Sequence, residues 1–252
     1  MYLMYDNAGF TEATITDGSY SSNTYSDGGN TITNEERIND QSISTQITSY
    51  AGTDAILIDF GSAVTVDAIS IYMNAAESDN IYLARSSDGT NGTTIANLTT
   101  DFNANSWQVN TFTSGGSVTY RYFMLGQGTG SSTFTGMTEV ILGKKLTFEM
   151  NPDIGISEQE IFGSTVQRSI GGVEFGFKTH EPISTKSINF SNVSQTFKNN
   201  LQSFESAVTN HKKFLFYDDS TIQYVRLEGP IQFSEVAYQR YSASFTVIEQ
   251  LS

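Results

Sequence analysis

The chain has 252 residues, of which 38 % are hydrophobic, and a net charge of −14 at pH 7. At about 150 residues per domain, this length predicts two domains, each able to bury a hydrophobic core. The sequence contains no cysteine, which excludes a disulfide framework, cysteine-ligated zinc, iron–sulfur clusters and thiol catalysis. The apolar runs are far shorter than the roughly 18 residues that span a bilayer, and the N-terminus shows no leader pattern. We therefore expect a soluble protein without membrane insertion.

The charge is distributed unevenly along the chain. Residues 1–143 contain three arginines, no lysine and 15 acidic residues, for a net charge of −12, whereas residues 144–252 contain ten cationic and 12 acidic residues, for −2. All three prolines also follow this break. The composition therefore predicts one domain over 1–143 and another over 144–252. Because so acidic a first domain cannot neutralise a row of phosphates, we expect no nucleic-acid specificity.

Short apolar stretches, separated by turn-forming dipeptides, fill the first domain. The dipeptides Asp17-Gly18, Asp27-Gly28 and Asp88-Gly89 predict turns. Between turns, β-branched and aromatic residues predict strands over Ala55–Phe60, Val64–Tyr72, Ile81–Arg85, Tyr120–Leu125 and Met137–Leu142. Inside Val64–Tyr72 the apolar positions change from even to odd numbers, which predicts a bulge or bend near Ala68. The pattern favours an all-β sandwich.

Three parts of this domain resemble the discoidin-like (galactose-binding-like) jelly rolls. Ile56–Tyr72 is similar to the family's "aliphatic-Asp-Leu-Gly … Val … Ile" strand pair, and Ile81–Gly89 to its strand followed by a Ser-Asp-Gly turn. Asn105–Gln108 with Tyr120–Leu125 resembles its "Trp … aromatic-Arg-Tyr" pair. The likeness covers about residues 8–143 and implies a discoidin-like jelly-roll sandwich, a fold that sometimes carries a structural calcium ion. The family's frequent terminal disulfide is absent, and no exposed aromatic pair marks a glycan-binding loop.

The second domain shows strands on both sides of one helix. The expected strands are Lys145–Met150, Gly172–Lys178, Ser187–Phe190, Lys213–Tyr217, Thr221–Glu228 and Tyr241–Glu249. Residues Phe197, Leu201, Phe204 and Val208 recur at helical spacing and form one apolar stripe, which predicts a helix near 193–210. Asn192 and Gln195 form the expected N-terminal capping pair.

This order of elements, together with Gly171–Phe175, Phe214–Asp218 and Tyr224–Leu227, resembles tail proteins of tailed bacteriophages. The resemblance is to the tail-tube-like β-sandwich of distal tail and minor tail proteins, and it covers roughly residues 144–252. It implies an antiparallel β-sandwich with one α-helix that assembles as a homohexameric ring in the virion tail. The implied partners are further copies of the chain and other tail proteins of the tube, tip or hub. The first domain would then project outward, towards host surface glycans.

No residue pattern predicts catalysis. His180 and His211 lie 31 positions apart, and Asp59-Phe60-Gly61 matches a kinase motif without the lysine that would hold phosphates. We interpret Asp59-Phe60-Gly61 as a strand end and the glycine-rich Gly126–Gly130 as a flexible loop. The adjacent acids Glu35-Glu36 are typical of a solvated surface. The sequence predicts no catalytic, cofactor or metal residue and therefore no enzyme.

Two interpretations stay open at this stage. Acid-rich turns around Asp17, Asp27 and Asp88 offer oxygen ligands for a structural calcium ion, but without the alternation of an EF-hand loop they indicate turn formation. Trp107, the only tryptophan, is expected to anchor the core rather than to stack on a sugar. With Phe197, Leu201, Phe204 and Val208, it completes the candidate residues for core packing or assembly.

The sequence thus predicts a non-catalytic structural component of a phage tail, in the distal tail or baseplate ring that links tube to tip. The alternative is a glycan-binding adhesin or carbohydrate-binding module outside any virion. A polysaccharide-degrading enzyme would instead need paired carboxylates in a cleft, such as Asp218-Asp219.

Overall fold

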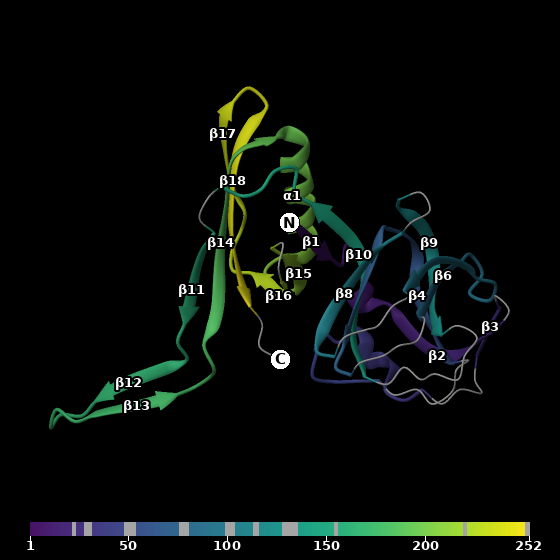
Figure 1. Cartoon of the computed structure of the whole chain (residues 1–252), viewed down its shortest axis with the longest axis horizontal. Helices are drawn as coiled ribbons and strands as arrows, with labels where there is room; N and C mark the ends of the chain where they lie inside the picture. The colour runs from purple at the N-terminus through teal and green to yellow at the C-terminus, as the bar shows by residue number, and fades with distance from the viewer. Residues whose placement is uncertain are drawn as a thin grey trace. The chain divides into compact units, whose positions relative to one another are not determined.

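The computed structural model describes residues 1–21, 24–27, 32–47, 54–75, 81–98, 104–112, 116–127, 136–153, 156–218 and 221–249 (Figure 1). The chain divides into two compact units. The first unit is Leu3–Leu146, and the second unit combines Met1–Tyr2 with Thr147–Leu251. The charge break at residue 144 falls inside strand β10 (Met137–Thr147), so no loop marks the change in composition.

The first unit is a sandwich of two β-layers. One layer has the order β3 (Thr24–Asp27), β2 (Thr14–Ser21), β4 (Asp54–Val66), β9 (Val118–Gln127), β6 (Ile81–Ser86) and β7 (Thr93–Leu98). The other has β1 (Tyr2–Tyr5), β10, β5 (Ala68–Met73) and β8 (Ser106–Thr111). Two short 3-10 helices, η1 (Phe10–Glu12) and η2 (Glu35–Asn39), complete the described elements.

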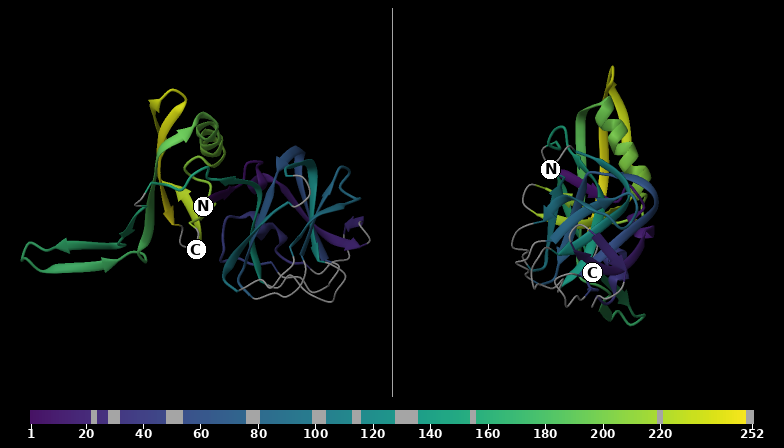
Figure 2. Two further views of the ribbon diagram at one scale, coloured as in Figure 1. Left: turned by 45° about the horizontal axis from the view of Figure 1, so that its top comes forward. Right: turned by 90° about the vertical axis from the view of Figure 1, so that its right-hand side faces the viewer.

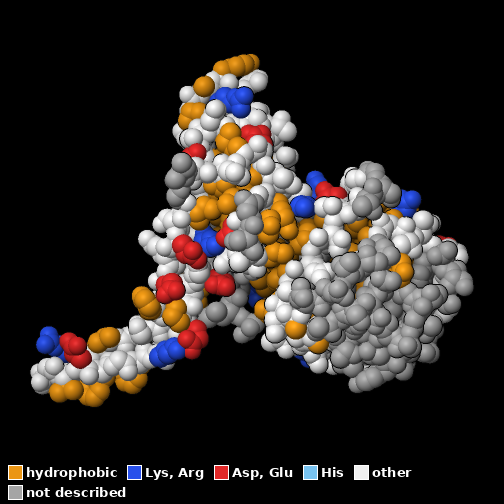
Figure 3. Space-filling model, in the orientation of Figure 1, with side chains coloured by type: hydrophobic (Ala, Val, Ile, Leu, Met, Phe, Trp, Pro, Cys, Tyr) orange, Lys and Arg blue, Asp and Glu red, His pale blue; other side chains and the backbone are white. Residues whose placement is uncertain are grey.

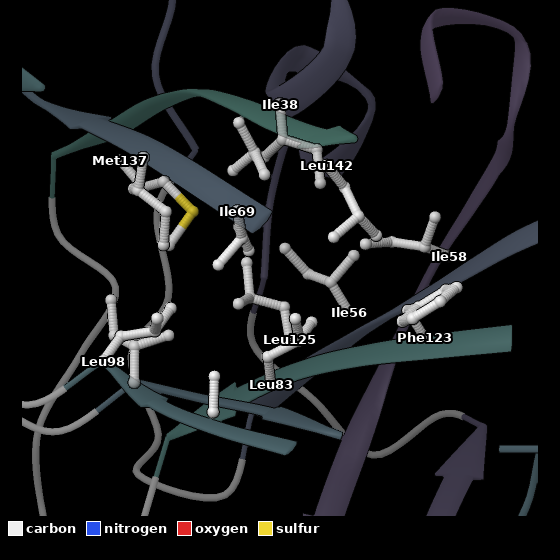
Figure 4. Packing of buried hydrophobic residues seen from close by; sticks show 14 of the residues in the cluster. Ile38, Ile56, Ile58, Ile69, Leu83, Leu98, Phe123, Leu125, Met137 and Leu142 are labelled. Carbon is white, nitrogen blue, oxygen red and sulfur yellow. The ribbon is translucent and has the colours of Figure 1, made fainter. Parts of the chain in front are cut away.

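Apolar side chains from both layers meet between them. Ile56 and Ile58 of β4, with Leu125 of β9, face Ile69 of β5 and Leu142 of β10 (Figure 4). These side chains alternate along each strand with residues of the opposite face, which is the pattern that the sequence shows. Burying them supplies the main stabilisation of the unit.

Within Val64–Tyr72, the apolar residues change from even-numbered to odd-numbered positions where the chain crosses from one layer to the other. We expected one strand with a bulge near Ala68, but β4 ends at Val66 and β5 begins at Ala68 in the opposite layer. Asp67, between them, accepts a hydrogen bond from the Lys145 amide at 2.8 Å, and its own amide donates to the Gly143 carbonyl at 2.9 Å. Burial raises the pKa of Asp67, against the opposing effect of the Lys145 amide and of nearby lysines.

Two predicted features of the first unit are wrong. Asp17-Gly18 lies within β2 instead of forming a turn. Gly18 is required there because an added Cβ would lie 2.5 Å from the Tyr25 ring, which crosses the strand. Asp59-Phe60-Gly61 is not a strand end, because β4 continues through it with a bulge between Asp59 and Val64. The expected turn at Asp88-Gly89 is confirmed, with Gly89 at a φ of 76°. The loop predicted over Gly126–Gly130 does not include Gly126 and Gln127, which are the last residues of β9. Gly28 of the Asp27-Gly28 dipeptide and Gly128–Gly130 lie outside the described residues.

The second unit is a sheet with one helix and one protruding hairpin. Its strands follow the order β11 (Ser157–Ile161), β14 (Ile183–Ser194), β18 (Arg240–Glu249), β16 (Ile222–Leu227) and β15 (Phe214–Tyr217). β17 (Gln232–Ala237) pairs with the beginning of β18, and β12 (Ser164–Arg168) pairs with β13 (Glu174–Lys178) in a separate two-stranded sheet. The predicted list lacked β11, β12 and β17, which contain few core residues.

Helix α1 (Gln195–Val208) packs against β14 and β18 (Figure 2). Ser194, rather than the predicted Asn192, caps it: the Ser194 hydroxyl accepts a hydrogen bond from the Phe197 amide at 3.1 Å and donates one to the Glu149 carboxylate. The four stripe residues Phe197, Leu201, Phe204 and Val208 are all buried. The Phe204 ring meets Phe214 edge-on at 4.8 Å, and the Phe197 ring meets Phe190 at 5.6 Å.

The chain is therefore all-β, with antiparallel sheets and, among the described residues, a single α-helix. This is the fold class that the sequence predicts. Within those residues, no helix is long and apolar enough to cross a membrane.

Candidate assembly interface

Exposed apolar side chains gather on two hairpins of the second unit. Among the described residues, nine large hydrophobic side chains are exposed, and all nine belong to this unit: Ile161, Phe162, Val166, Ile170, Val173, Phe175, Phe177, Val236 and Tyr238. Seven lie on or next to the β12–β13 hairpin, residues 162–181, which we call the arm. The other two lie at the β17–β18 hairpin (Figure 3). Clusters of exposed apolar side chains mark interaction sites in soluble proteins.

The arm has two chemically different faces. Its register pairs Thr165 with Phe177 and Gln167 with Phe175, and successive side chains of a strand point to opposite sides. One side, the phenylalanine face, therefore carries Thr165, Gln167, Phe175 and Phe177. The opposite side, the charged face, carries Ser164, Val166, Arg168, Glu174, Gly176 and Lys178. All ten strand residues are exposed.

Backbone hydrogen bonds close the arm at both ends. At the tip, the Ser169 amide donates to the Val173 carbonyl at 2.8 Å and the Gly172 amide donates to the Ser169 carbonyl at 2.9 Å. Gly172 has a φ of 81°, a conformation that favours glycine. At the base, the Thr179 amide and hydroxyl both donate to the Gly163 carbonyl. A Cβ on Gly163 would meet the His180 backbone, so this position has no room for a side chain.

The β17–β18 hairpin lies at the other end of the same sheet. β14 and β18 run antiparallel, with Thr185 opposite Ile248 and Ser194 opposite Arg240. The arm enters β14 at its Ile183 end, whereas the turn before Arg240 lies beside the Ser194 end. In Figure 1 the two hairpins point away from each other, and the length of β14, which has 12 residues, separates them.

A nearly buried ion pair ties β14 to the end of β15. Lys186 donates to Asp218 with 2.6 Å between Nζ and Oδ2, and Glu158 of β11 lies 3.9 Å from the same nitrogen. Burial alone would raise the pKa of Asp218, but hydrogen bonds from Lys186 and Thr221 hold that pKa well below its usual range. The pair is structural, because its groups are already engaged with each other. Asp219, the other acid of the predicted pair, lies outside the described residues.

In the first unit, the Asp59 carboxylate braces the bulge of β4. Its two oxygens accept hydrogen bonds from Arg121 Nε at 2.7 Å and Nη2 at 2.8 Å, and the Gly61 amide donates to the same group at 2.8 Å. The Arg121 hydrogen bonds lower the pKa of Asp59. The Arg121 guanidinium also covers the Tyr122 ring at 4.7 Å. A guanidinium held in this way serves the fold rather than a ligand.

The other residues singled out from the sequence lie apart. Trp107 is buried on β8 and meets the Tyr72 ring edge-on at 5.3 Å. His180 sits at the base of the arm, while His211 follows α1 and is hydrogen-bonded to the Thr209 hydroxyl at 2.6 Å. Among the described residues, no three His, Asp or Glu side chains lie close enough together to hold a metal ion.

Sequence reasoning missed the arm as a surface. It predicted one of the two arm strands, over Gly172–Lys178, but not Ser164–Arg168. The missed signal is the alternation of Phe175 and Phe177 with small or charged residues after a Gly-Gly turn, preceded by a short Ser-Thr-Val run.

Comparisons with known proteins give no family and no curated relative: no family model matches the chain, and no curated protein matches it. Part of the chain is similar to solved carbohydrate-binding modules. One is CBM32-1 from a family 31 glycoside hydrolase of Clostridium perfringens, with 16 % identity over 55 % of this chain and 100 % of that one, at a TM-score of 0.40. Another is the CBM32 of AlyQ in complex with 4,5-unsaturated mannuronic acid, with 20 % identity over 55 % and 96 %, at 0.40. A third is chitosan-binding module 1 from a chitosanase/glucanase of Paenibacillus sp. IK-5, with 21 % identity over 57 % and 98 %, at 0.37.

Proposed function

We propose that the protein is a non-catalytic, self-assembling structural component of a phage tail. In this proposal the second unit forms the ring of a distal tail or baseplate assembly, with other tail proteins as axial partners. The single observation that supports it most is the arm, whose exposed phenylalanines have no role in the fold of the monomer. The sequence resemblance to tail-tube-like domains also supports this proposal, because it rests on the same order of elements in the second unit: strands, one helix and further strands.

Ring formation follows from the type of surface that the second unit presents. Two different patches at opposite ends of one sheet suit a head-to-tail contact, and such contacts close into rings or extend into filaments. The resemblance to tail proteins implies six copies. An unpaired strand edge such as β11, whose five residues are all exposed, is an aggregation liability unless another copy or protein covers it.

The test is the mass of the native full-length protein. Native mass spectrometry, with light scattering after size exclusion at several concentrations, should show one closed oligomer, with six copies as the expected number. A monomer at all concentrations up to about 100 µM would overturn the assembly function. Electron microscopy of particles that contain the protein would locate it in the virion tail or elsewhere.

Glycan contact by the first unit is the second candidate function. The segments that resemble discoidin-like jelly rolls lie on β4, β5, β6, β8 and β9 of a two-layer sandwich, as that resemblance implies. In a tail this unit would contact host surface glycans. A panel of immobilised glycans tests the point with the full chain: binding by an oligomer supports a tail component with a glycan-contacting module. Binding by a strictly monomeric protein favours the alternative, an adhesin or carbohydrate-binding module outside a virion.

A further inference from the structure

The arm cannot be explained by its own stability. An isolated two-stranded hairpin is at best marginally stable in water, because it lacks a third strand or a helix to cover its apolar side. The phenylalanine face has two large rings and two uncharged polar side chains, all exposed. The charged face is suited to water, since Arg168 and Glu174 form a cross-strand ion pair at 3.8 Å and Lys178 pairs with Glu181. One side of the hairpin is built for solvent and the other for a partner.

The second apolar patch has matching chemistry. Val236 and Tyr238 are exposed at the β17–β18 hairpin, flanked by Glu235 and Arg240. The opposite side of this hairpin is already covered, because the Lys198 ammonium of α1 lies 4.0 Å from the Tyr241 ring centre and 5.9 Å from that of Phe233. Only the outer side is therefore available to a partner.

Charge indicates a second copy as that partner. The chain carries −14 overall, yet the arm contains two cations and two acids and residues 232–240 contain one of each, so both patches are neutral. Two copies that approached through their acidic surfaces would repel each other, whereas two neutral apolar patches meet without that cost. An anionic membrane would instead attract a basic arm.

The positions of the patches decide how two copies meet. The arm joins β14 at one end and the β17–β18 turn lies at the other, roughly 36 Å away for 11 steps of about 3.3 Å between the 12 residues of β14. A patch cannot reach its complement within one copy, but it can reach that of the next. We infer that the phenylalanine face of the arm packs on the outer side of the β17–β18 hairpin of a second copy. The inference deepens the proposed function and rests on it.

The first experiment removes the phenylalanine face from the full-length protein. The double variant Phe175→Ser/Phe177→Ser should raise the dissociation constant for self-association at least about 100-fold, because buried aromatic residues dominate interface affinity. Val166→Ser is the matched control, because Val166 is an apolar residue of the same hairpin that is at least as exposed as the two phenylalanines but lies on the charged face. It should assemble like the wild type. Thermal unfolding of all three proteins should be alike, since the changed side chains are exposed.

The second experiment tests the pairing itself. The variant Val236→Asp/Tyr238→Ser keeps its arm but loses the receiving patch, and alone it should stay monomeric, like the arm variant. When the two variants are mixed, the intact arm of one can pack on the intact hairpin of the other, so a heterodimer should form. Native mass spectrometry distinguishes this 1:1 species from either homo-oligomer.

The possible outcomes test the proposed interface and the proposed assembly function separately. If the wild type assembles and the arm variant assembles equally well, the inference is wrong while the assembly function stands. If both variants are monomeric but their mixture gives no heterodimer, the arm contacts another surface and the pairing is again wrong. A wild-type protein that is monomeric contradicts both. A monomer that binds anionic phospholipid vesicles through Phe175 and Phe177 identifies the arm as a membrane contact and overturns the inference.

Discussion

At the scale of single residues, the Lys186–Asp218 pair is the main buried electrostatic contact of the second unit. The two side chains are only 9 % and 13 % exposed. Because removing one partner leaves a buried charge without its counterion, Asp218→Asn should lower the free energy of unfolding by about 3 kcal/mol near pH 7. Urea unfolding measures this loss. The exposed pair Lys178–Glu181 supplies the control, since Glu181→Gln should cost less than about 1 kcal/mol.

The same pair makes stability depend on pH in a defined direction. The pKa of Asp218 is lowered in the folded state, so its contribution is complete above the unfolded value near 3.9 and disappears as the pH falls towards the folded value. The wild type should therefore lose more stability between pH 6 and pH 3 than Asp218→Asn does. A constant difference between the two proteins across this range would show that the carboxylate charge has no part in the stabilisation.

Gly143 is a residue whose lack of a side chain has a visible cause. A Cβ at this position would clash with the Tyr5 carbonyl oxygen, because β1 and β10 approach each other closely there. Gly143→Ala should therefore displace β1 and destabilise the first unit by roughly 1–3 kcal/mol. Gly176→Ala is the control, since nothing lies within 4 Å of its added methyl group. Thermal unfolding that is unchanged by Gly143→Ala would refute the steric argument.

At the scale of elements, the stability of the second unit depends on the contact between α1 and its sheet. Phe204 is fully buried and its ring meets Phe214 edge-on. Replacing Phe204 with Ala should lower the free energy of unfolding by roughly 3–5 kcal/mol, through lost burial and a cavity that the sheet cannot fill. Ser203→Ala, on the exposed side of the helix, should change it by less than about 0.5 kcal/mol. A loss below about 1 kcal/mol for Phe204→Ala would mean that this face contributes little to folding.

The elements with a core-facing pattern were predictable from the sequence. The helix was found because Phe197, Leu201, Phe204 and Val208 repeat at its period, and β18 because Ala243, Phe245 and Val247 alternate with polar residues. β12 was missed because only Val166 of its five residues is apolar. A strand that pairs only within an exposed hairpin has no buried face, so its sequence does not need the alternating apolar residues that reveal a strand.

Tertiary structure overrode two local signals. Asp17-Gly18 has the composition of a turn, yet the Tyr25 ring needs the space above Gly18, and the dipeptide lies inside a strand. The change from even to odd apolar positions near Ala68 correctly indicated a break in the strand. Whether such a break is a bulge or a crossing between layers depends on partners that are distant in sequence, such as Gly143 and Lys145. The candidate interface was hidden for a related reason: a pattern of apolar residues does not reveal whether the chain itself covers them.

At the scale of the whole molecule, the net charge of −14 opposes any association of copies. The net negative charge is concentrated before residue 144, where only three cations oppose 15 acids, while the arm and residues 232–240 are neutral. Repulsion between copies is thus a long-range effect that salt screens, whereas the proposed contact is short-range and apolar. These two contributions respond differently to solution conditions, so they can be separated by experiment.

Salt should therefore strengthen self-association of the wild type. Raising NaCl from about 20 mM to about 500 mM shortens the screening length severalfold and removes most of the repulsion, while the apolar contact between arm and hairpin persists. Lowering the pH from 8 towards the isoelectric point near 4.4 should act in the same direction, because the acidic side chains lose charge. Sedimentation velocity at fixed protein concentration measures both effects, and Phe175→Ser/Phe177→Ser should stay monomeric under the high-salt condition. If association weakened as salt increased, ion pairs between copies would be its main source of affinity, and the phenylalanine face would not.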